Sequence, residues 1–207
     1  MSATGRSGAS DARRAAHGDA PPAGRLVYVV GPSGAGKDSV LGALRSSWPD
    51  CLVAHWARRT ITRPESAGGE RHEAVDAAAF ERLLAQGAFA QHWFANGLGY
   101  GVRQSELQPL ACGQWVFVNG SRGYLPQLLR RWSTATVVHI GAAPEVLQQR
   151  LQARGRETAA AQAARLQRDP HLQLPAGSIC IQNDGALQAA ADELRARLLG
   201  GYPTVGC

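Results

Sequence analysis

The segment with the clearest chemistry is a glycine-rich stretch made of Gly31, Pro32, Ser33, Gly34, Ala35, Gly36, Lys37, Asp38 and Ser39. Residues 31–37 match the pattern GxxxxGK, directly after the apolar run 26–30 and directly before a helical pattern over 37–46. Glycines let backbone N–H groups turn toward an anion, the helix N-terminus adds partial positive charge, and the lysine reaches the β- and γ-phosphates. The sequence therefore predicts a phosphate-binding loop for ATP, with Lys37 as a catalytic residue.

The residue after Lys37 departs from the usual loop. That position normally holds Ser or Thr, whose hydroxyl helps to hold Mg²⁺, but here it is Asp38, followed by Ser39. A carboxylate is also a good hard-oxygen ligand, and an anion suits the first turn of a helix. Two interpretations stay open: Asp38 replaces the hydroxyl, directly or through a water, or it only caps the helix while Ser39 or solvent serves the metal. We expect ATP and Mg²⁺ as cofactors, with Asp38 and Ser39 as candidate metal ligands.

Polar and basic residues follow two further strand candidates, at 51–55 and 115–118. They are Arg58, Arg59, Thr60, Thr62 and Arg63 after the first, and Asn119, Ser121 and Arg122 after the second. Open α/β sheets bind ligands at the carboxyl ends of their strands, so these groups are candidates for an acceptor site that faces the loop. The alternative for residues 58–64 is a solvated basic loop.

A third arginine-rich segment covers residues 150–168. Arg150 and Arg154 are spaced i, i+4 and share a helix face, and Gly155 follows as a hinge. Such a lid could close over a triphosphate and neutralise charge that develops on the transferred group. The alternative is an exposed arginine-rich helix.

No Ser-His-Asp arrangement and no paired-carboxylate signature stands out. A phosphate acceptor is already ionised near neutral pH and needs no general base, so catalysis would consist of positioning and charge neutralisation. An acceptor hydroxyl would more often require a poised carboxylate. The missing base therefore favours a phosphate group as the acceptor.

Short apolar runs alternate with helical patterns from residue 26 onward, which predicts an α/β fold of the P-loop type with a parallel sheet flanked by helices. The strand candidates are 26–30, 51–55, 89–94, 115–118, 136–140 and 178–181. The helix candidates are 37–46, 77–86, 104–111, 124–131, 144–153 and 186–199.

The 207 residues suffice for one domain, which we place at 25–207, with an acceptor-binding insert at about 57–103. Residues 1–24 hold almost no large apolar side chains and are predicted to be a disordered extension. The net charge of +6 is carried by dispersed arginines, with Lys37 as the sole lysine, so we expect no nucleic-acid partner. No apolar run reaches a membrane span, and the four separated cysteines fit free, mostly buried thiols, so we expect a cytoplasmic protein without a membrane partner.

Several motifs together resemble the guanylate kinase-like P-loop kinases over roughly residues 25–199. They are GPSGAGK at 31–37, the TxTR loop at 60–63, the segment from Phe89 to Tyr100 and Gly101, and RLxxRG at 150–155. Within that group, GPSGAGKDS, FANG at 94–97, VNGSR at 118–122, RGRE at 154–157 and NDG at 183–185 are similar to the subfamily that phosphorylates ribose 1,5-bisphosphate in phosphonate breakdown.

The resemblance implies transfer of the γ-phosphoryl of ATP to ribose 1,5-bisphosphate, which gives 5-phospho-α-D-ribose 1-diphosphate. It implies that Lys37, Arg150 and Arg154 are catalytic, and that the acceptor is bound by Arg59, Thr62, Arg63, Tyr100, Asn119, Ser121 and Arg122. Where guanylate kinases have a serine, a guanine-reading glutamate, a hydroxyl and a phosphate-contacting tyrosine, this chain has Arg59, Gln91, Val102 and His72. Losing the base-reading groups disfavours GMP as the acceptor. The alternatives are a guanylate kinase with an altered base pocket and a non-catalytic interaction module.

Overall fold

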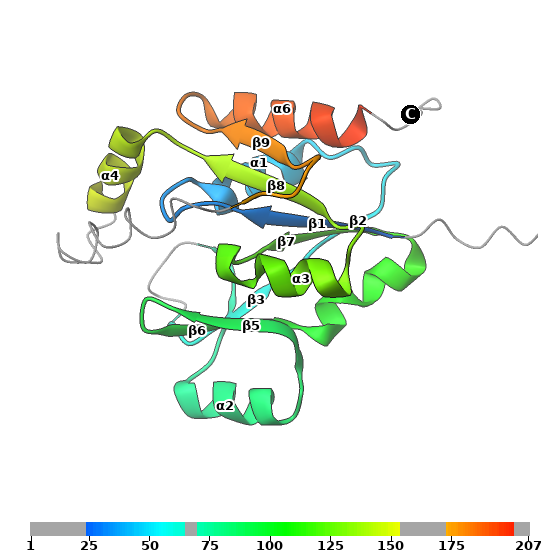
Figure 1. Ribbon diagram of the computed structural model, residues 1–207, viewed down its shortest axis with the longest axis vertical. Coiled ribbons are helices and arrows are strands. Elements are labelled where there is room, and N and C mark those ends of the chain that lie inside the picture. The colour runs from blue at the N-terminus through cyan, green and yellow to red at the C-terminus, as the bar shows by residue number, and fades with distance from the viewer. Residues whose placement is uncertain (1–23, 65–69, 154–172, 201–207) are drawn as a thin grey trace, which may run out of the picture.

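The computed structural model describes residues 24–64, 70–153 and 173–200. Within these residues the strands form two sheets (Figure 1). The first contains, in order across the sheet, β2 (Ala54–Trp56), β7 (Trp115–Asn119), β1 (Arg25–Val30), β8 (Thr136–Gly141) and β9 (Ile179–Gln182), all parallel. The second contains β4 (Glu73–Ala74), β3 (Arg59–Ile61), β6 (Leu98–Arg103) and β5 (Phe89–Ala95).

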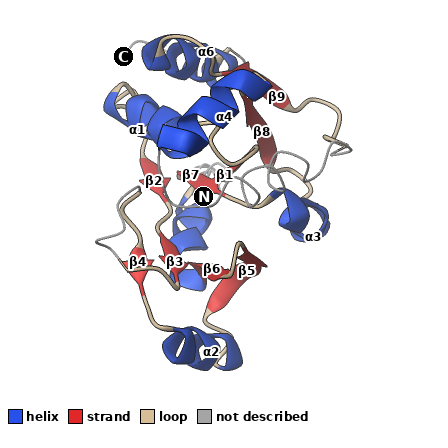
Figure 2. Ribbon diagram, turned by 90° about the vertical axis from the view of Figure 1, so that its left-hand side faces the viewer, coloured by secondary structure: helices blue, strands red, loops and turns tan. Residues whose placement is uncertain are grey.

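Five α-helices and two 3₁₀-helices connect the described strands. The α-helices are α1 (Lys37–Ser46), α2 (Ala77–Ala85), α3 (Leu125–Arg131), α4 (Pro144–Ala153) and α6 (Leu187–Leu199), and the 3₁₀-helices are η2 (Gln104–Cys112) and η3 (Arg122–Tyr124). Helices α1 and α6 cover one side of the first sheet, and the second sheet with α2 lies on the other side (Figures 1 and 2).

The central strand β1 is buried on both faces, as a strand between parallel neighbours must be. Val27 and Val29 belong to the apolar cluster under α1 and α6, whereas Leu26 and Val30 belong to the cluster on the opposite face with α3. Because both faces are apolar, the polar chemistry is confined to the carboxyl ends of the strands, where the loops leave the core.

The second sheet is antiparallel except for the pairing of β3 with β4. A hairpin joins β5 to β6 through Asn96 and Gly97, both with positive φ, as a two-residue turn requires. On this sheet Thr60 and Arg103 both donate hydrogen bonds to Glu73: Thr60 Oγ1 lies 2.7 Å from Oε2, and Arg103 Nη2 lies 2.6 Å from Oε1. This network ties the short strand β4 to β3 and β6.

Most expected elements agree with the structure, and the expected fold class is confirmed. The prediction was incomplete in the stretch from 57 to 103: β3, β4 and β6 were not expected, and residues 59–61, interpreted as part of a loop, form a strand. These strands are two to six residues long and gain their stability from cross-strand pairing, which is not visible in a local pattern. The first predicted strand after α1 lies at Ala54–Trp56 instead of 51–55, and 104–112 is a 3₁₀-helix.

Several expectations fall on residues outside the described part of the chain. One is the disordered extension at 1–24, of which only residue 24 is described. The other is the lid from residue 154 onward, which includes Arg154. Cys112 and Cys180 are free, as expected, but the expectation that the thiols are mostly buried is wrong for them, because both are exposed. Cys51 is exposed and disulfide-bonded, so the expectation of a free thiol is wrong there. Among the described helices, none has the length and apolarity needed to cross a membrane.

The carboxylate of Glu73, on the edge strand β4 of the second sheet, gives a prediction about acid stability. Burial alone would raise the pKa of Glu73, but the hydrogen bonds from Arg103 and Thr60 outweigh it and lower that pKa below the usual 4.5. The stabilising contribution of Glu73 is therefore present above about pH 4.5 and is lost as the pH falls through the lowered folded-state pKa. Glu73→Gln should lower the melting temperature at neutral pH, and the difference from the unmodified chain should shrink in acid. The exposed Glu81→Gln on α2 serves as the control, and a Glu73→Gln difference that stayed constant with pH would contradict this.

Candidate active site

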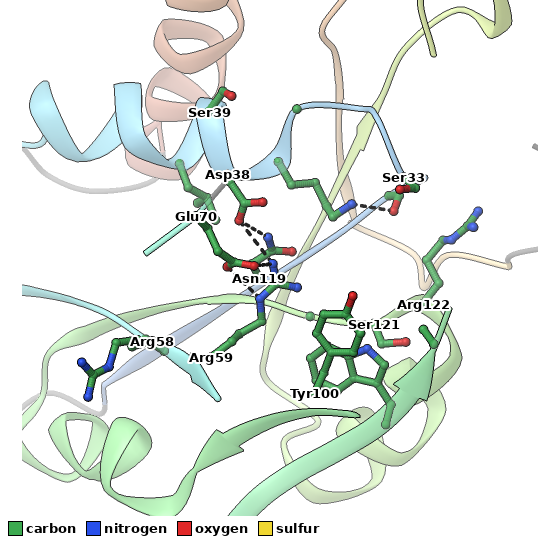
Figure 3. Close-up of a pocket in the computed structure, with 18 of the residues that line it drawn as sticks. Ser33, Asp38, Ser39, Arg58, Arg59, Glu70, Tyr100, Asn119, Ser121 and Arg122 are labelled. Atoms are coloured by element: carbon green, nitrogen blue, oxygen red, sulfur yellow. Dashed lines mark hydrogen bonds and ion pairs between the residues drawn. The ribbon is translucent and has the colours of Figure 1, made fainter. Parts of the chain in front are cut away.

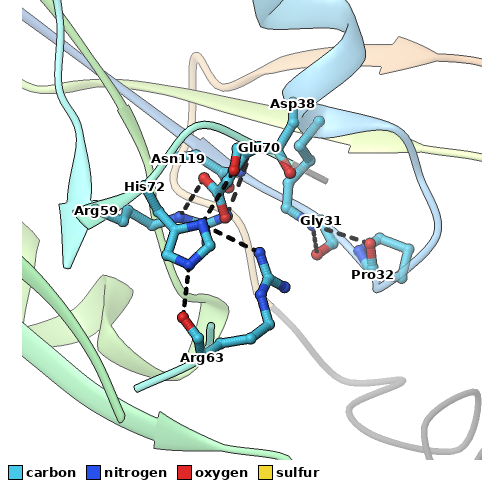
Figure 4. Close-up of polar contacts among 9 residues, drawn as sticks. Gly31, Pro32, Asp38, Arg59, Arg63, Glu70, His72 and Asn119 are labelled. Atoms are coloured by element: carbon cyan, nitrogen blue, oxygen red, sulfur yellow. Dashed lines mark hydrogen bonds and ion pairs between the residues drawn. The ribbon is translucent and has the colours of Figure 1, made fainter. Parts of the chain in front are cut away.

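The glycine-rich segment forms a tight loop between β1 and α1. Gly31 has a φ of 151°, and a Cβ there would lie 2.0 Å from the carbonyl oxygen of Ile140 on β8, so the close approach to β8 requires glycine. Gly36 is the left-handed N-cap of α1, and no side chain caps the helix there. Lys37 Nζ lies 2.9 Å from Gly31 O and 3.0 Å from Pro32 O (Figure 4). A cationic side chain and a helix N-terminus thus face the same loop, as phosphate binding requires.

Two side chains from later elements support this loop. Asn183, directly after β9, donates from Nδ2 to Ala35 O at 2.8 Å, and its side chain is buried. A Cβ on Gly36 would lie 2.5 Å from that Nδ2 and 3.8 Å from Nη1 of Arg150 on α4. Arg150 Nη1 is buried and has no hydrogen-bond partner among the described residues. The structure thus brings Arg150 to the loop and leaves one of its donors unpaired there.

Asp38 lies where α1, β7 and β3 meet (Figure 3). Its Oδ1 accepts a hydrogen bond from Nδ2 of Asn119 at the end of β7, and lies 3.5 Å from Nη2 of Arg59 on β3. Its side chain is 44% exposed. Ser39 is exposed and points away from this group in Figure 3. Of the two candidate metal ligands, Asp38 is the one that the structure places beside other site residues.

Arg59 and Glu70 form a buried ion pair. Arg59 Nε lies 2.8 Å from Glu70 Oε2, and Arg59 Nη2 contacts Glu70 Oε1. The side chains are 10% and 14% exposed. Burial alone would lower the pKa of Arg59, but the carboxylates of Glu70 and Asp38 raise it above its usual value, so the guanidinium stays charged. Burial raises the pKa of Glu70 and Asp38 adds to the rise, whereas Arg59 opposes it.

The segment between β3 and β4 is braced by His72 (Figure 4). This ring is 2% exposed, and its nitrogens lie 2.9 Å from Arg63 O and 3.0 Å from Glu70 O. Arg63 Nη2 lies 3.5 Å from His72 Nδ1, and Arg63 Nε is buried without a partner among the described residues. His72 therefore fixes the backbone that carries Arg63 and Glu70 and does not itself face the cleft.

A buried tyrosine positions the segment after β7. The hydroxyl of Tyr28 accepts a hydrogen bond from Ser121 N at 2.9 Å and donates to Ser121 O at 3.3 Å. A Cβ on Gly120 would lie 2.0 Å from the Tyr28 ring, so the intervening residue must be glycine. Tyr28 thereby fixes the backbone that carries Ser121 and Arg122.

These elements surround one cleft of about 1400 Å³. Most of the predicted site residues line it, as do Arg58 and Glu70. The predicted residues on its wall are Gly31, Ser33, Gly34, Gly36, Lys37, Asp38, Ser39, Arg59, Arg63, Tyr100, Asn119, Ser121 and Arg122. Pro32 and Ala35, which belong to the loop, and Arg150, which approaches Gly36 from α4, do not line the cleft. Thr62 does not line the cleft, because its Oγ1 accepts a hydrogen bond from Gly99 N at 2.8 Å within the second sheet.

Positive charges lie near His139 beside the loop. The pKa of His139, near the end of β8, is lowered by burial and then by the positive charges of Arg122 and Lys37. Tyr100 stacks on Trp93 with 5.5 Å between ring centroids, and Arg59 Cζ lies 5.6 Å from the Tyr100 ring. The cleft therefore combines cationic groups with one aromatic wall, which suits a compact, multiply charged anion better than a neutral ligand.

Three contributors were not predicted from the sequence. Glu70 follows two glycines and carries no local signal, and its role depends on contact with Arg59. Tyr28 could have been noticed, because it is a polar side chain in an otherwise aliphatic buried strand. Asn183 was noticed only as part of an NDG string that also fits a turn.

Comparisons with known proteins agree with this geometry. No protein-family model matches the chain. The chain is 45% identical over 178 residues to "Ribose 1,5-bisphosphate phosphokinase PhnN" of Janthinobacterium sp. (strain Marseille), a match that covers 84% of this chain and 39% of that protein. It is 45% identical over 184 residues to the protein of the same name from Pseudomonas paraeruginosa, covering 86% of this chain and 96% of that one.

The chain belongs to the ribose 1,5-bisphosphate phosphokinase family. It spans only 39% and 42% of the length of the relatives from Janthinobacterium and Laribacter hongkongensis, but nearly all of the Pseudomonas relative. Among solved structures, guanylate kinase from Anaplasma phagocytophilum matches with a TM-score of 0.64 and 18% identity, covering 88% of each chain. This second likeness supports the guanylate kinase-like fold, which the family shares here despite low sequence identity.

The buried pair gives a stability prediction for this member of the family. Glu70→Gln leaves the charge of Arg59 with only the more distant Asp38 as counter-ion, and an uncompensated buried charge costs about 3 kcal/mol. We expect urea denaturation to show a loss of about that size. The exposed pair of Arg197 and Glu193 on α6 provides the control, since Glu193→Gln should change stability by less than about 0.5 kcal/mol. Equal losses in the two variants would contradict the role given to Glu70.

Proposed function

We propose that the protein transfers the γ-phosphoryl group of ATP to the 1-phosphate of ribose 1,5-bisphosphate. The products are ADP and 5-phospho-α-D-ribose 1-diphosphate. The observation that carries the proposal is a single cleft in which the phosphate-binding loop faces Arg63 and Arg122, which come from two different elements. Two phosphates on one small sugar need cationic groups on several sides, and the relatives named for this substrate share the chain over most of its length.

The proposed reaction needs few groups from the protein. An oxygen of the acceptor phosphate attacks the γ-phosphorus, the bond to the β–γ bridging oxygen breaks, and ADP leaves with that oxygen. Lys37 holds the β- and γ-phosphates, and Arg150 neutralises charge on the transferred group from the loop side. Arg154 is proposed to act with Arg150 from the lid at 150–168.

The residues at the loop fit Mg²⁺. Asp38 offers a carboxylate, Ser39 a hydroxyl, and Asn119 a buried amide oxygen that has no partner among the described residues. When bound with ATP, the ion would neutralise charge on the β- and γ-phosphates. The chain's own part is to hold the nucleotide so that the ion and Lys37 lie on the same phosphates.

A phosphate acceptor agrees with the state of the carboxylates on the cleft wall. Among the described residues, the carboxylates that line it are those of Asp38 and Glu70, and both contact Arg59. Neither is a carboxylate held ready for a hydroxyl proton. An ionised phosphate needs no such group, so Arg63, Arg122 and Tyr100, which line the cleft, suffice to orient it. We accordingly propose that residues 57–103 bind the acceptor.

The residues that line the cleft also disfavour the guanylate kinase alternative. A purine edge is recognised by hydrogen-bonding groups that face it, yet Gln91 is 1% exposed and Val102 is fully buried, and neither lines the cleft. A non-catalytic interaction module would not need Lys37 or the unpaired donor of Arg150 at the loop. We also infer a cytoplasmic location, because the reaction consumes ATP.

The deciding experiment is ³¹P NMR of the protein with Mg-ATP and either ribose 1,5-bisphosphate or GMP. We expect the diphosphate signals of 5-phospho-α-D-ribose 1-diphosphate in the first sample alone. Phosphorylation of GMP alone would show that the acceptor has been misassigned. Silence in both samples would contradict the kinase assignment.

The loop lysine gives the sharpest mutational prediction. Lys37→Ala should lower kcat/KM by about 10²–10³-fold, because the cation on the transferring phosphate is lost while the fold of the loop is kept by its glycines. The exposed Arg197→Ala on α6 should keep full activity. Substantial turnover by Lys37→Ala would refute its catalytic role.

Arg63, which lines the cleft, and Arg150, which lies beside Gly36 of the loop, should affect different kinetic constants. Arg63→Gln should mainly raise the KM for the acceptor sugar, because Arg63 faces the acceptor. Arg150→Gln should mainly lower kcat, by about tenfold or more, because Arg150 is proposed to neutralise charge on the transferred group. Steady-state kinetics with each substrate varied in turn would measure both, and an identical pattern in the two variants would be inconsistent with these positions.

A further inference from the structure

Residues 38 and 119 together differ from the usual metal-binding pair of a P-loop enzyme. That pair consists of a Ser or Thr directly after the loop lysine and an aspartate carried by a neighbouring strand. In this chain the residue after Lys37 is an aspartate, and the residue that faces it is an asparagine. Each position therefore holds the kind of group, carboxylate or neutral oxygen, that is usual at the other position.

The structure shows that Asn119 occupies the strand position. It is the last residue of β7, which pairs in parallel with β1, the strand that leads into the loop. Asn119 pairs with Val29 in register, and Gly120 N donates to Val29 O at 2.8 Å. The side chain of Asn119 reaches α1 and donates from Nδ2 to Asp38 Oδ1 (Figure 3). Residues 38 and 119 are therefore partners.

An independent observation points to a ligand at this pair. Asn119 is 5% exposed, and its Oδ1 is buried without a hydrogen-bond partner among the described residues. An unpaired buried amide oxygen is costly, and an amide oxygen is a suitable ligand for a hard cation or for the water that such a cation holds. The bond from Nδ2 to Asp38 fixes which face of the amide is left for that ligand.

We propose that the carboxylate and the neutral partner of the metal site have exchanged positions in this chain. Asp38 on α1 supplies the negative charge that a strand aspartate usually supplies, and Asn119 on β7 supplies the neutral oxygen that the loop hydroxyl usually supplies. The site keeps one carboxylate, one neutral oxygen and a hydrogen bond between them. The donor, Asn119, is on β7 and the acceptor, Asp38, is on α1. The inference deepens the proposed function and rests on it for the use of a magnesium nucleotide.

The buried ion pair of Arg59 and Glu70 explains why the carboxylate of Asp38 is available to a cation. Arg59 Nη2 lies 3.5 Å from Asp38 Oδ1, a long contact, whereas two nitrogens of Arg59 contact the carboxylate of Glu70. Glu70 therefore compensates most of the charge of Arg59. Without Glu70, Arg59 would compete with a metal ion for Asp38.

The test compares four proteins: the unmodified chain, Asp38→Ser, Asn119→Asp, and the variant with both changes, which restores the usual pair. Isothermal titration calorimetry measures ADP affinity with and without Mg²⁺, and electron paramagnetic resonance measures binding of Mn²⁺ in the presence of ADP. We expect Asp38→Ser to lose most of the gain in ADP affinity that Mg²⁺ provides, by about tenfold or more. We expect the doubly changed protein to regain it to within about threefold, so that the two changes are strongly non-additive.

Asn119→Asp alone places two carboxylates in contact, so it should weaken ADP binding without metal and enlarge the gain from Mg²⁺. Asp76→Asn, which removes one negative charge at the N-terminus of α2 and keeps a capping side chain, is the control and should behave as the unmodified chain. The melting temperature shows that each variant is folded.

An unchanged Mg²⁺ effect in Asp38→Ser, or a double variant no better than Asp38→Ser, would overturn the exchange. None of these measurements uses the acceptor sugar, so a wrong acceptor assignment would leave their outcome untouched.

Discussion

The interaction on which the site depends is the buried charge of Arg59. This side chain starts on a strand of the second sheet and ends against Glu70, Asp38 and the ring of Tyr100. Because a buried guanidinium must keep its counter-ions, α1, which carries Asp38, and the segment before β4, which carries Glu70, are held to β3. The phosphate loop and the proposed acceptor side are thereby linked by electrostatics as well as by the chain.

The rest of the site divides into a part that is fixed by packing and a part that is available for ligands. Tyr28, His72 and Asn183 are buried and bond to backbone groups of the segments after β7, after β3 and within the loop. They account for the positions of Ser121, Arg63 and the loop glycines. Arg63, Arg150, Asn119 and Asn183 itself each keep one buried polar atom without a partner among the described residues. Such atoms are where bound phosphate or metal would be expected to complete the structure.

The guanylate kinase structure and the family relatives show different things about this molecule: the first shows its fold, and the second show its family. A guanylate kinase shares the fold at 18% identity, so the arrangement of sheets and loop tolerates extensive substitution. The family relatives share 45% of their residues with the chain over the matched region. On the second sheet, Gln91 and Val102 are withdrawn from the cleft and Arg59 lines it. Selectivity for the acceptor would follow from that sheet while the nucleotide side stays the same.

The sequence alone determined the phosphate loop, the α/β class and most core elements, because these follow from local patterns: glycine spacing, apolar runs and helical periodicity. It also indicated that Arg59, Asn119 and Arg122 lie at strand ends. Only the tertiary structure decided which of these side chains contact one another. It paired Arg59 with Glu70, turned Thr62 into the sheet, and placed Asn119 against Asp38 across 81 residues of sequence. Those contacts depend on the order and register of strands that are distant in the chain, which no local pattern encodes.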